Sequence, residues 1–156
     1  MTIASDRNAF QWASFRKCSL EGATLEGGVS SFQRARFDAA KLARASLKGS
    51  DCSFQMSTFV GADLTGATLI GGPSSFQGAS FEDAILIDAR LSGSFQSVNL
   101  SGAKFDAADL SAIAGDDLAS CYLKNPPTYD ARTKFPPGFD PVERLWKRVD
   151  SHRTGD

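Results

Sequence analysis

Residues 53–69 read SFQMSTFVGADLTGATL, and this short stretch decides the fold. Its large apolar residues recur at every fifth position, at Phe54, Phe59, Leu64 and Leu69. On an α-helix a step of five residues turns the side chain by about 140°, and on a flat strand an odd step sends successive side chains to opposite faces. All four residues can therefore face one interior only if the chain turns a corner once in every five residues.

The same spacing extends in both directions along the chain. Further large apolar residues lie at Phe10, Phe15, Leu20, Leu25, Phe32, Phe37, Leu42, Leu47, Phe76, Phe81, Leu86, Leu91, Phe95, Leu100, Phe105 and Leu110. The residue two positions before most of them is small, usually alanine, and the residue between is mostly polar. Because residues two apart on an extended segment point the same way, the small residue also faces inward. The pattern indicates a narrow solenoid in which each side is one five-residue unit.

A second period gives the number of sides. Phe10, Phe32, Phe54 and Phe76 are 22 residues apart, because four steps of five are followed by one step of seven. The extra residues lie in turn-prone stretches such as residues 27–29 (GGV) and 71–73 (GGP). Each coil therefore has four sides. The spacing falls to four residues between Leu91 and Phe95, which predicts an irregularity there.

The five-residue unit resembles the repeat of the pentapeptide-repeat family, in which alanine, an aspartate or asparagine, and leucine precede two variable residues. Residues 62–66 (ADLTG) and 108–112 (ADLSA) are examples in this chain. The resemblance runs from about Asn8 to Ala112. It implies the family's fold, an all-β solenoid in the form of a right-handed quadrilateral β-helix, here with about five coils. We expect this β-helix over residues 8–123, and a C-terminal loop and capping helix over residues 124–156.

The C-terminal segment has its own signals. Residues 129–141 (YDARTKFPPGFDP) are similar to the ending Y-D-x-x-T-x-F-P-x-G-F-D-P of cyanobacterial members of the family, and their prolines are expected to end strand pairing. Asp140 is a candidate N-cap, Pro141 the first helical residue and Glu143 the capping-box partner. Apolar residues at helical spacing follow at Val142, Leu145, Trp146 and Val149. We expect a short helix that folds over the open end of the solenoid, with a dimerising helix as the second interpretation.

The motif Ser-Phe-Gln recurs at residues 31–33, 53–55, 75–77 and 94–96, and Phe10-Gln11 opens the series. Stacked in register, the motif places five glutamines in one column: Gln11, Gln33, Gln55, Gln77 and Gln96. Identical amides one strand apart can hydrogen-bond along such a column. We favour a ladder that fixes the register, and the other interpretation is a polar strip for a ligand.

The outer surface offers one candidate contact with a partner. Ile85 and Ile87 should point outward next to each other, and Glu82, Asp83 and Asp88 lie close by in sequence. Residues 8–51 carry seven basic and four acidic side chains, whereas residues 52–123 carry two basic and eight acidic ones. An accidental asymmetry of a solvated surface is the favoured interpretation; an acidic contact surface or head-to-tail association is the other. The C-terminal tail is an alternative cover for the two isoleucines.

Composition and motifs exclude several classes of protein. The formal net charge of −1 argues against a nucleic-acid binder, and no apolar run is long enough to span a bilayer. The first residues lack the pattern of a signal peptide, and the three scattered cysteines give no disulfide framework, so we predict a cytoplasmic location. Cys18 and Cys52 fall at small inward positions, and His152 lies in a polar terminus. Without a catalytic or metal-binding motif, we expect no enzyme, no cofactor and no metal site.

The sequence therefore predicts a non-enzymatic binding or structural scaffold that presents flat β-helix faces to a protein partner, as a monomer or homodimer. The family resemblance implies an alternative, a DNA mimic that binds a type II topoisomerase such as gyrase. Family members with that role use a long, acidic and usually dimeric rod. The rod expected here is short and about neutral, so we place the scaffold first.

Overall fold

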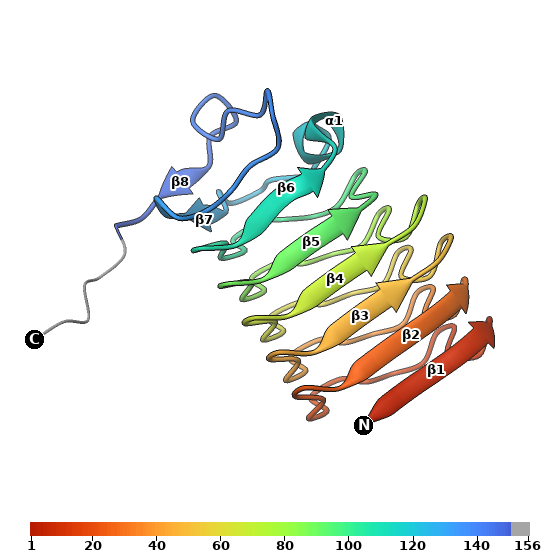
Figure 1. Cartoon of the computed structure of the whole chain (residues 1–156). Helices are drawn as coiled ribbons and strands as arrows, with labels where there is room; N and C mark the ends of the chain where they lie inside the picture. The colour runs from red at the N-terminus through yellow and green to blue at the C-terminus, as the bar shows by residue number, and fades with distance from the viewer. Residues whose placement is uncertain (151–156) are drawn as a thin grey trace, which may run out of the picture.

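Six parallel strands stack along one side of the molecule and give it the form of a rod (Figure 1). The structure is a computed structural model that describes residues 1–150. The strands are β1 (Thr2–Arg7), β2 (Thr24–Val29), β3 (Ser46–Gly49), β4 (Thr68–Gly71), β5 (Arg90–Gly93) and β6 (Asp109–Ile113). Each strand pairs with the next one in chain order. Because the chain returns to the same side once per coil, the molecule is a solenoid, as the repeats predict.

The pairing keeps one leucine above another along this sheet. Leu25 pairs with Leu47, Leu47 with Leu69, and Leu69 with Leu91. The register shifts between β5 and β6, at Arg90 and Ser92. This is where the next coil begins without the extra residues of the seven-residue step, so the irregularity predicted before Phe95 is present.

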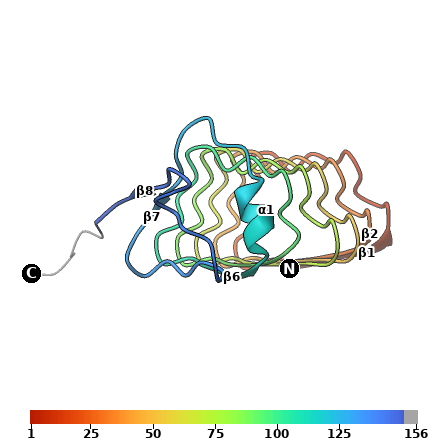
Figure 2. The same ribbon diagram turned by 90° about the horizontal axis from the view of Figure 1, so that it is seen from above.

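Three further sides complete each coil. Parallel bridges join Ser14, Arg36, Thr58, Ser80 and Asn99 on one of them, and Lys41, Asp63, Ile85 and Lys104 on another. On the remaining side, main-chain hydrogen bonds join successive coils; one example is the 2.8 Å bond from Phe32 N–H to Ser53 O. We number the sides in chain order: side one carries Phe10, side two Phe15, side three Leu20, and side four is the β1–β6 sheet. Figure 2 shows the successive coils following one another along the rod. The pairing on four sides of each coil confirms the four-sided β-helix.

Stacked aromatic rings fill much of the interior. Phe32 and Phe54 on side one are fully buried, and their ring centroids are 5.0 Å apart with the planes 1° from parallel. Phe37 and Phe59 stack in the same way on side two, at 4.8 Å. This spacing matches the ~4.8 Å between paired strands, so one ring per coil fills each column. Each buried ring contributes about 1.5–3 kcal/mol relative to exposure, and contacts between neighbouring coils hold the solenoid together.

The stack extends beyond the expected five coils at both ends. β1 forms a rung before residue 8, so side four has six strands. At the other end Thr128 and Lys134 pair with Lys104 and Asp109, and this pairing crosses the expected boundary at residue 123. The prolines do not end strand pairing as expected, because Thr128 and Lys134, which pair, lie between Pro127 and Pro136. The N–H groups of Thr128 and Lys134 each donate a 2.9 Å hydrogen bond to a carbonyl of the preceding coil.

The helix expected to begin at Pro141 does not form. Residues 141–145 make turns, and the chain then enters β8 (Lys147–Arg148), which pairs with β7 (Thr128–Tyr129). Asp140 does cap the first turn, since its Oδ1 accepts hydrogen bonds from the N–H groups of Val142 and Glu143 at 2.8 and 3.4 Å. The turn stops at Leu145, where a φ of 62° leaves the helical region and directs the chain into β8. Within residues 1–150 the one α-helix is α1 (Gly115–Ala119), directly after β6.

The C-terminal segment nevertheless closes the rod at the end opposite β1 (Figure 1). Trp146 is 5% exposed, and its ring lies 5.2 Å from that of Phe105 and 5.4 Å from that of Phe135. Val142 and Leu145, which were expected to share its apolar stripe, are 69% and 78% exposed. Of these three residues, Trp146 alone is buried at the end of the rod, and it directly follows the turn of residues 141–145.

Candidate protein-binding surfaces

One coil of side three carries the residues expected to meet a partner. Ile85 and Ile87 flank a buried leucine on this side, and both are half-buried. Glu82 and Asp83 lie at the corner before them, and Asp88 lies at the corner after them. The structure thus brings all five residues together around one short side of one coil. We call this set the Ile85 surface.

The Ile85 surface is a small apolar area among carboxylates. Asp83 and Asp88 are exposed, and none of its three acidic residues makes an ion pair within residues 1–150. Along the rod Asp63 and Lys104 pair with Ile85 on either side, so the apolar area is confined to one coil. Glu82 Oε2 accepts a 3.4 Å hydrogen bond from Asn99 Nδ2. Two aliphatic side chains between carboxylates without ion pairs match the chemistry of a basic protein segment that also carries apolar groups.

The five glutamines of the Ser-Phe-Gln series form one continuous column on the outside of the rod. The Nε2 of each donates to the Oε1 of the next at 3.1, 2.6, 2.9 and 3.1 Å, in the order Gln11, Gln33, Gln55, Gln77 and Gln96. Each inner amide therefore has one donor and one acceptor used within the column. This arrangement ties each coil to its neighbour. Gln11 donates its second amide hydrogen to Asn8 Oδ1 at 3.2 Å, whereas Gln33, Gln55 and Gln77 each keep one for other partners.

The serine of the same motif has a role that the fivefold spacing does not predict. Ser53 and Ser75 are fully buried. The Oγ of Ser53 lies 2.7 Å from Gly28 O, and the Oγ of Ser75 lies 2.7 Å from Gly72 O. Each hydroxyl thus holds the loop of a seven-residue step against the core. The signal in the sequence is that serine directly precedes the phenylalanine in four coils.

Neither cysteine that was expected to face inward is buried. Cys52 is half-buried with a φ of 57°, because the seven-residue step makes Ser53 the small buried residue beside Phe54. Cys18 is exposed, because β1 covers only side four of the first coil and no described residue covers Cys18 on side three. Packing in the core therefore does not explain either thiol.

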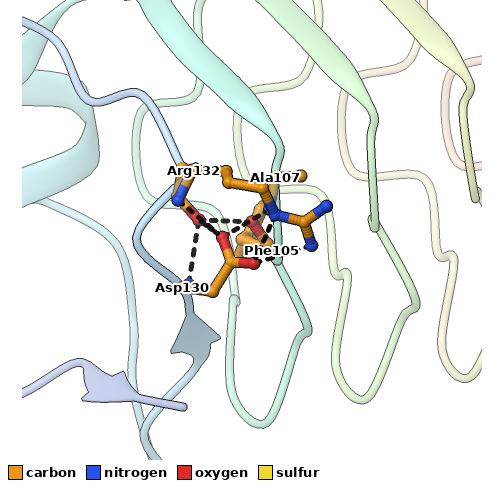
Figure 3. Close-up of polar contacts among 5 residues, drawn as sticks. Phe105, Ala107, Asp130 and Arg132 are labelled. Carbon is orange, nitrogen blue, oxygen red and sulfur yellow. Dashed lines mark hydrogen bonds and ion pairs between the residues drawn. The ribbon is translucent and has the colours of Figure 1, made fainter. Parts of the chain in front are cut away.

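Asp130 is a buried carboxylate that anchors the last coil (Figure 3). Its Oδ1 accepts hydrogen bonds from the N–H groups of Ala107 and Arg132, each at 2.9 Å, and its Oδ2 meets the Arg132 guanidinium at 2.8 Å. Burial raises the pKa of Asp130, but these bonds together lower it to about 2. Burial and then the charge of Asp130 raise the pKa of neighbouring Asp106, whose Oδ1 has no hydrogen-bond partner in the described chain. Asp130 has a structural role, since its carboxylate accepts hydrogen bonds from main-chain N–H groups.

Metal-binding groups, membrane-spanning helices and a reactive thiol were each sought among the described residues. Between residues 1 and 150 there is no group of three histidine, cysteine or acidic residues that could hold a metal ion. In the same range no helix is long and apolar enough to cross a membrane. Burial raises the pKa of the Cys121 thiol to about 12, which keeps it protonated at neutral pH. His152 lies outside the described residues.

Comparison with known proteins identifies the repeat. The family model described as pentapeptide repeats matches residues 30–69 and 74–111 with eight copies. A search of curated proteins gave no match.

Solved structures are also similar to this chain, and the first of those below has the same fold. The protein alr5209, a pentapeptide repeat protein from Nostoc Pcc 7120, is 24% identical over 77% of this chain and 88% of its own, with a TM-score of 0.53. Rfr23, a pentapeptide repeat protein from Cyanothece 51142, is 22% identical over 72% of this chain and 63% of its own, with a TM-score of 0.34. QnrB1, a plasmid-mediated fluoroquinolone resistance protein, is 16% identical over 97% of this chain and 89% of its own, with a TM-score of 0.43.

Proposed function

The chain belongs to the pentapeptide-repeat family, and from the surfaces of its coils we propose that it is a non-enzymatic scaffold that binds a protein partner. Its interior is filled by fully buried apolar columns, so a partner must bind on the outside. The stacked coils hold those outer faces in fixed positions, which reduces the entropy lost when a partner binds.

The observation that carries the proposal is the Ile85 surface. Two half-buried isoleucines lie there between the carboxylates of Glu82, Asp83 and Asp88, none of which has an ion-pair partner in residues 1–150. A partner segment with basic and apolar side chains would cover the isoleucines and pair with the carboxylates. Charge complementarity of this kind sets the association rate and the choice of partner.

Photo-crosslinking in the native host tests this surface. We expect Ile85→p-benzoylphenylalanine to form a specific protein adduct, which the additional changes E82Q, D83N and D88N should strongly reduce. The matched control is Ile70→p-benzoylphenylalanine, because Ile70 is an outward apolar residue of β4 on side four and is 45% exposed. Equal adducts at both positions, or none at position 85, would contradict the proposal.

The second candidate function is DNA mimicry directed at a type II topoisomerase. The observation in its favour is the excess of eight acidic over two basic side chains in residues 52–123. Mimicry requires carboxylates spaced like phosphates along one surface. Here Asp83 and Asp88 lie at different corners of the coil, and Lys104 lies on side three between them and the rod end. The scaffold is therefore the function we favour.

We further infer a cytoplasmic location, a cyanobacterial origin, and a monomeric or homodimeric state. The three cysteines Cys18, Cys52 and Cys121 are all free, which suits a reducing compartment. The sequence of residues 129–141 supports the origin. Sedimentation velocity of the purified protein would determine the oligomeric state directly.

A further inference from the structure

A second group of exposed residues lies on the first three coils. Trp12, Arg34 and Met56 occupy the same corner of successive coils, between sides one and two. Arg36 and Thr58 lie beside them on side two, where they pair with each other. Together these residues line a shallow groove of about 430 Å³, which we call the Trp12 groove.

The corner residues of this groove adopt a conformation that their side chains disfavour. Trp12, Arg34 and Met56 have φ values of 63°, 60° and 57°, in the left-handed region that suits glycine. The same corner of the next coil is Gly78, with a φ of 67°. Trp12 and Met56 are 67% and 48% exposed, so burial offsets little of the strain. Other corners of the rod, such as those at Lys17 and Arg44, also hold non-glycine residues in this region. What distinguishes this corner is therefore two large, exposed apolar side chains, Trp12 and Met56, without a packing role.

The two arginines of the groove have no acidic partner. Neither Arg34 nor Arg36 makes an ion pair within residues 1–150, although Arg16 on the same side of the rod pairs with Asp38 at 3.6 Å. The Cζ of Arg34 lies 4.7 Å from the ring centroid of Trp12. This contact holds the guanidinium by its face and leaves its in-plane N–H groups available for a carboxylate.

Thr58 adds an unsatisfied polar group to the lining of the groove. Its Oγ1 is buried and has no hydrogen-bond partner in the described chain. A buried hydroxyl without a partner destabilises the free protein. An acceptor that reaches this hydroxyl from the groove would satisfy it.

We propose that the Trp12 groove binds an acidic segment of a partner protein. Carboxylates of the segment form bidentate pairs with the guanidinium groups of Arg34 and Arg36. An apolar side chain of the segment packs on Trp12 and Met56. A nucleic acid fits less well, because a polyanion needs many basic contacts and residues 52–123 of the same rod are strongly acidic. This inference rests on the proposed function, because both take the ligand to be a protein. The Trp12 groove is basic, however, whereas the Ile85 surface is acidic.

Fluorescence anisotropy with the purified full chain tests the proposal. The probe is a fluorescein-labelled peptide of alternating aspartate and leucine, and the reference is the same peptide with asparagine in place of aspartate. We expect the acidic peptide to bind and R34Q/R36Q to weaken binding at least tenfold, which corresponds to about 1.4 kcal/mol. Trp12→Ala should also weaken it, because the ring supplies both the apolar contact and the support for Arg34.

The control variant K17Q/R44Q removes the same charge from the first two coils, at other left-handed corners. It should leave binding of the acidic peptide within about twofold of the wild type, because distant exposed charges are screened. Equal weakening by K17Q/R44Q, equal affinity for the asparagine peptide, or no binding at about 1 mM peptide would each overturn the proposal. The titration uses purified protein, so its outcome is independent of whether crosslinking at position 85 captures a partner.

Discussion

Asp130 and Asp106 are neighbouring carboxylates near the end of the rod, and their surroundings have opposite effects. Asp130 accepts main-chain and guanidinium donors, whereas an oxygen of Asp106 is buried without a partner. We expect Asp130→Asn to lower the free energy of unfolding at pH 7 by about 2 kcal/mol, because buried donors lose a charged acceptor. The control Asp106→Asn should be neutral or stabilising, because it removes a charge that burial and Asp130 oppose. Urea denaturation of both variants measures the difference.

The pH dependence of the free energy of unfolding tests the charge of Asp130 separately. The pKa of Asp130 falls from 3.8 to about 2 on folding, so its contribution is fully present above pH 4 and is lost as the pH falls through 2. The raised pKa of Asp106 acts in the opposite direction, since protonation of that residue favours the folded state. The loss of stability between pH 4 and pH 2 should therefore be shallower in Asp130→Asn than in the wild type. An unchanged slope would show that Asp130 does not hold this charge in the folded protein.

At the same scale, the repeat predicts where a side chain points but not what it bonds. The glutamine column follows from the spacing, because a fixed period places every Gln11 equivalent at the same point of its coil. Burial of Ser53 does not follow, because it depends on how the seven-residue loop returns to side one. Exposure of Cys18 depends on how far β1 extends over the first coil. Spacing alone contains none of this information.

Among the elements, the C-terminal cap depends on one side chain. We expect Trp146→Ala to destabilise the protein by about 3–5 kcal/mol, the usual cost of truncating a buried tryptophan. The indole covers Phe105 and Phe135 at the end of the stack, so its loss exposes the core. Leu145→Ala, one residue earlier, should change stability by less than about 0.5 kcal/mol, because Leu145 is 78% exposed. Thermal denaturation followed by circular dichroism compares the two, and equal effects would mean that Trp146 is not the cap.

The same element shows where local sequence signals fail. Asp140 caps a turn as its position predicts, but the helix that should follow is replaced by β8. Pairing of β8 with β7 and burial of Trp146 require Leu145 in the left-handed region, and these tertiary contacts override the helical spacing. The prolines of residues 126–137 fail as strand breakers for a related reason, since only the residues between them pair.

Across the whole molecule, the fold is a consequence of one short period repeated many times. Each coil contacts its neighbours in the same way, so a spacing of five residues with steps of seven is enough to predict sides, columns and register. Surface function has no such period. The Trp12 groove and the Ile85 surface each consist of residues that break the repetition, such as Trp12 and Met56 at a corner where Gly78 would suffice. The repeat in the sequence therefore locates the core more fully than the binding surfaces.

The distribution of charge along the rod leads to a prediction about gyrase. A DNA mimic acts through a continuous surface of negative charge, and its binding weakens steeply as salt is added. In this rod Glu82, Asp83 and Asp88 surround one side of one coil, and residues 8–51 carry seven basic against four acidic side chains. We therefore expect neither inhibition nor protection of DNA gyrase at micromolar concentrations of the protein, as measured in a supercoiling assay. The contrary result would be salt-sensitive binding to gyrase that disappears in E82Q/D83N/D88N but persists in R34Q/R36Q. It would make DNA mimicry the favoured function, because it would show that the acidic side chains of the Ile85 surface are sufficient for mimicry.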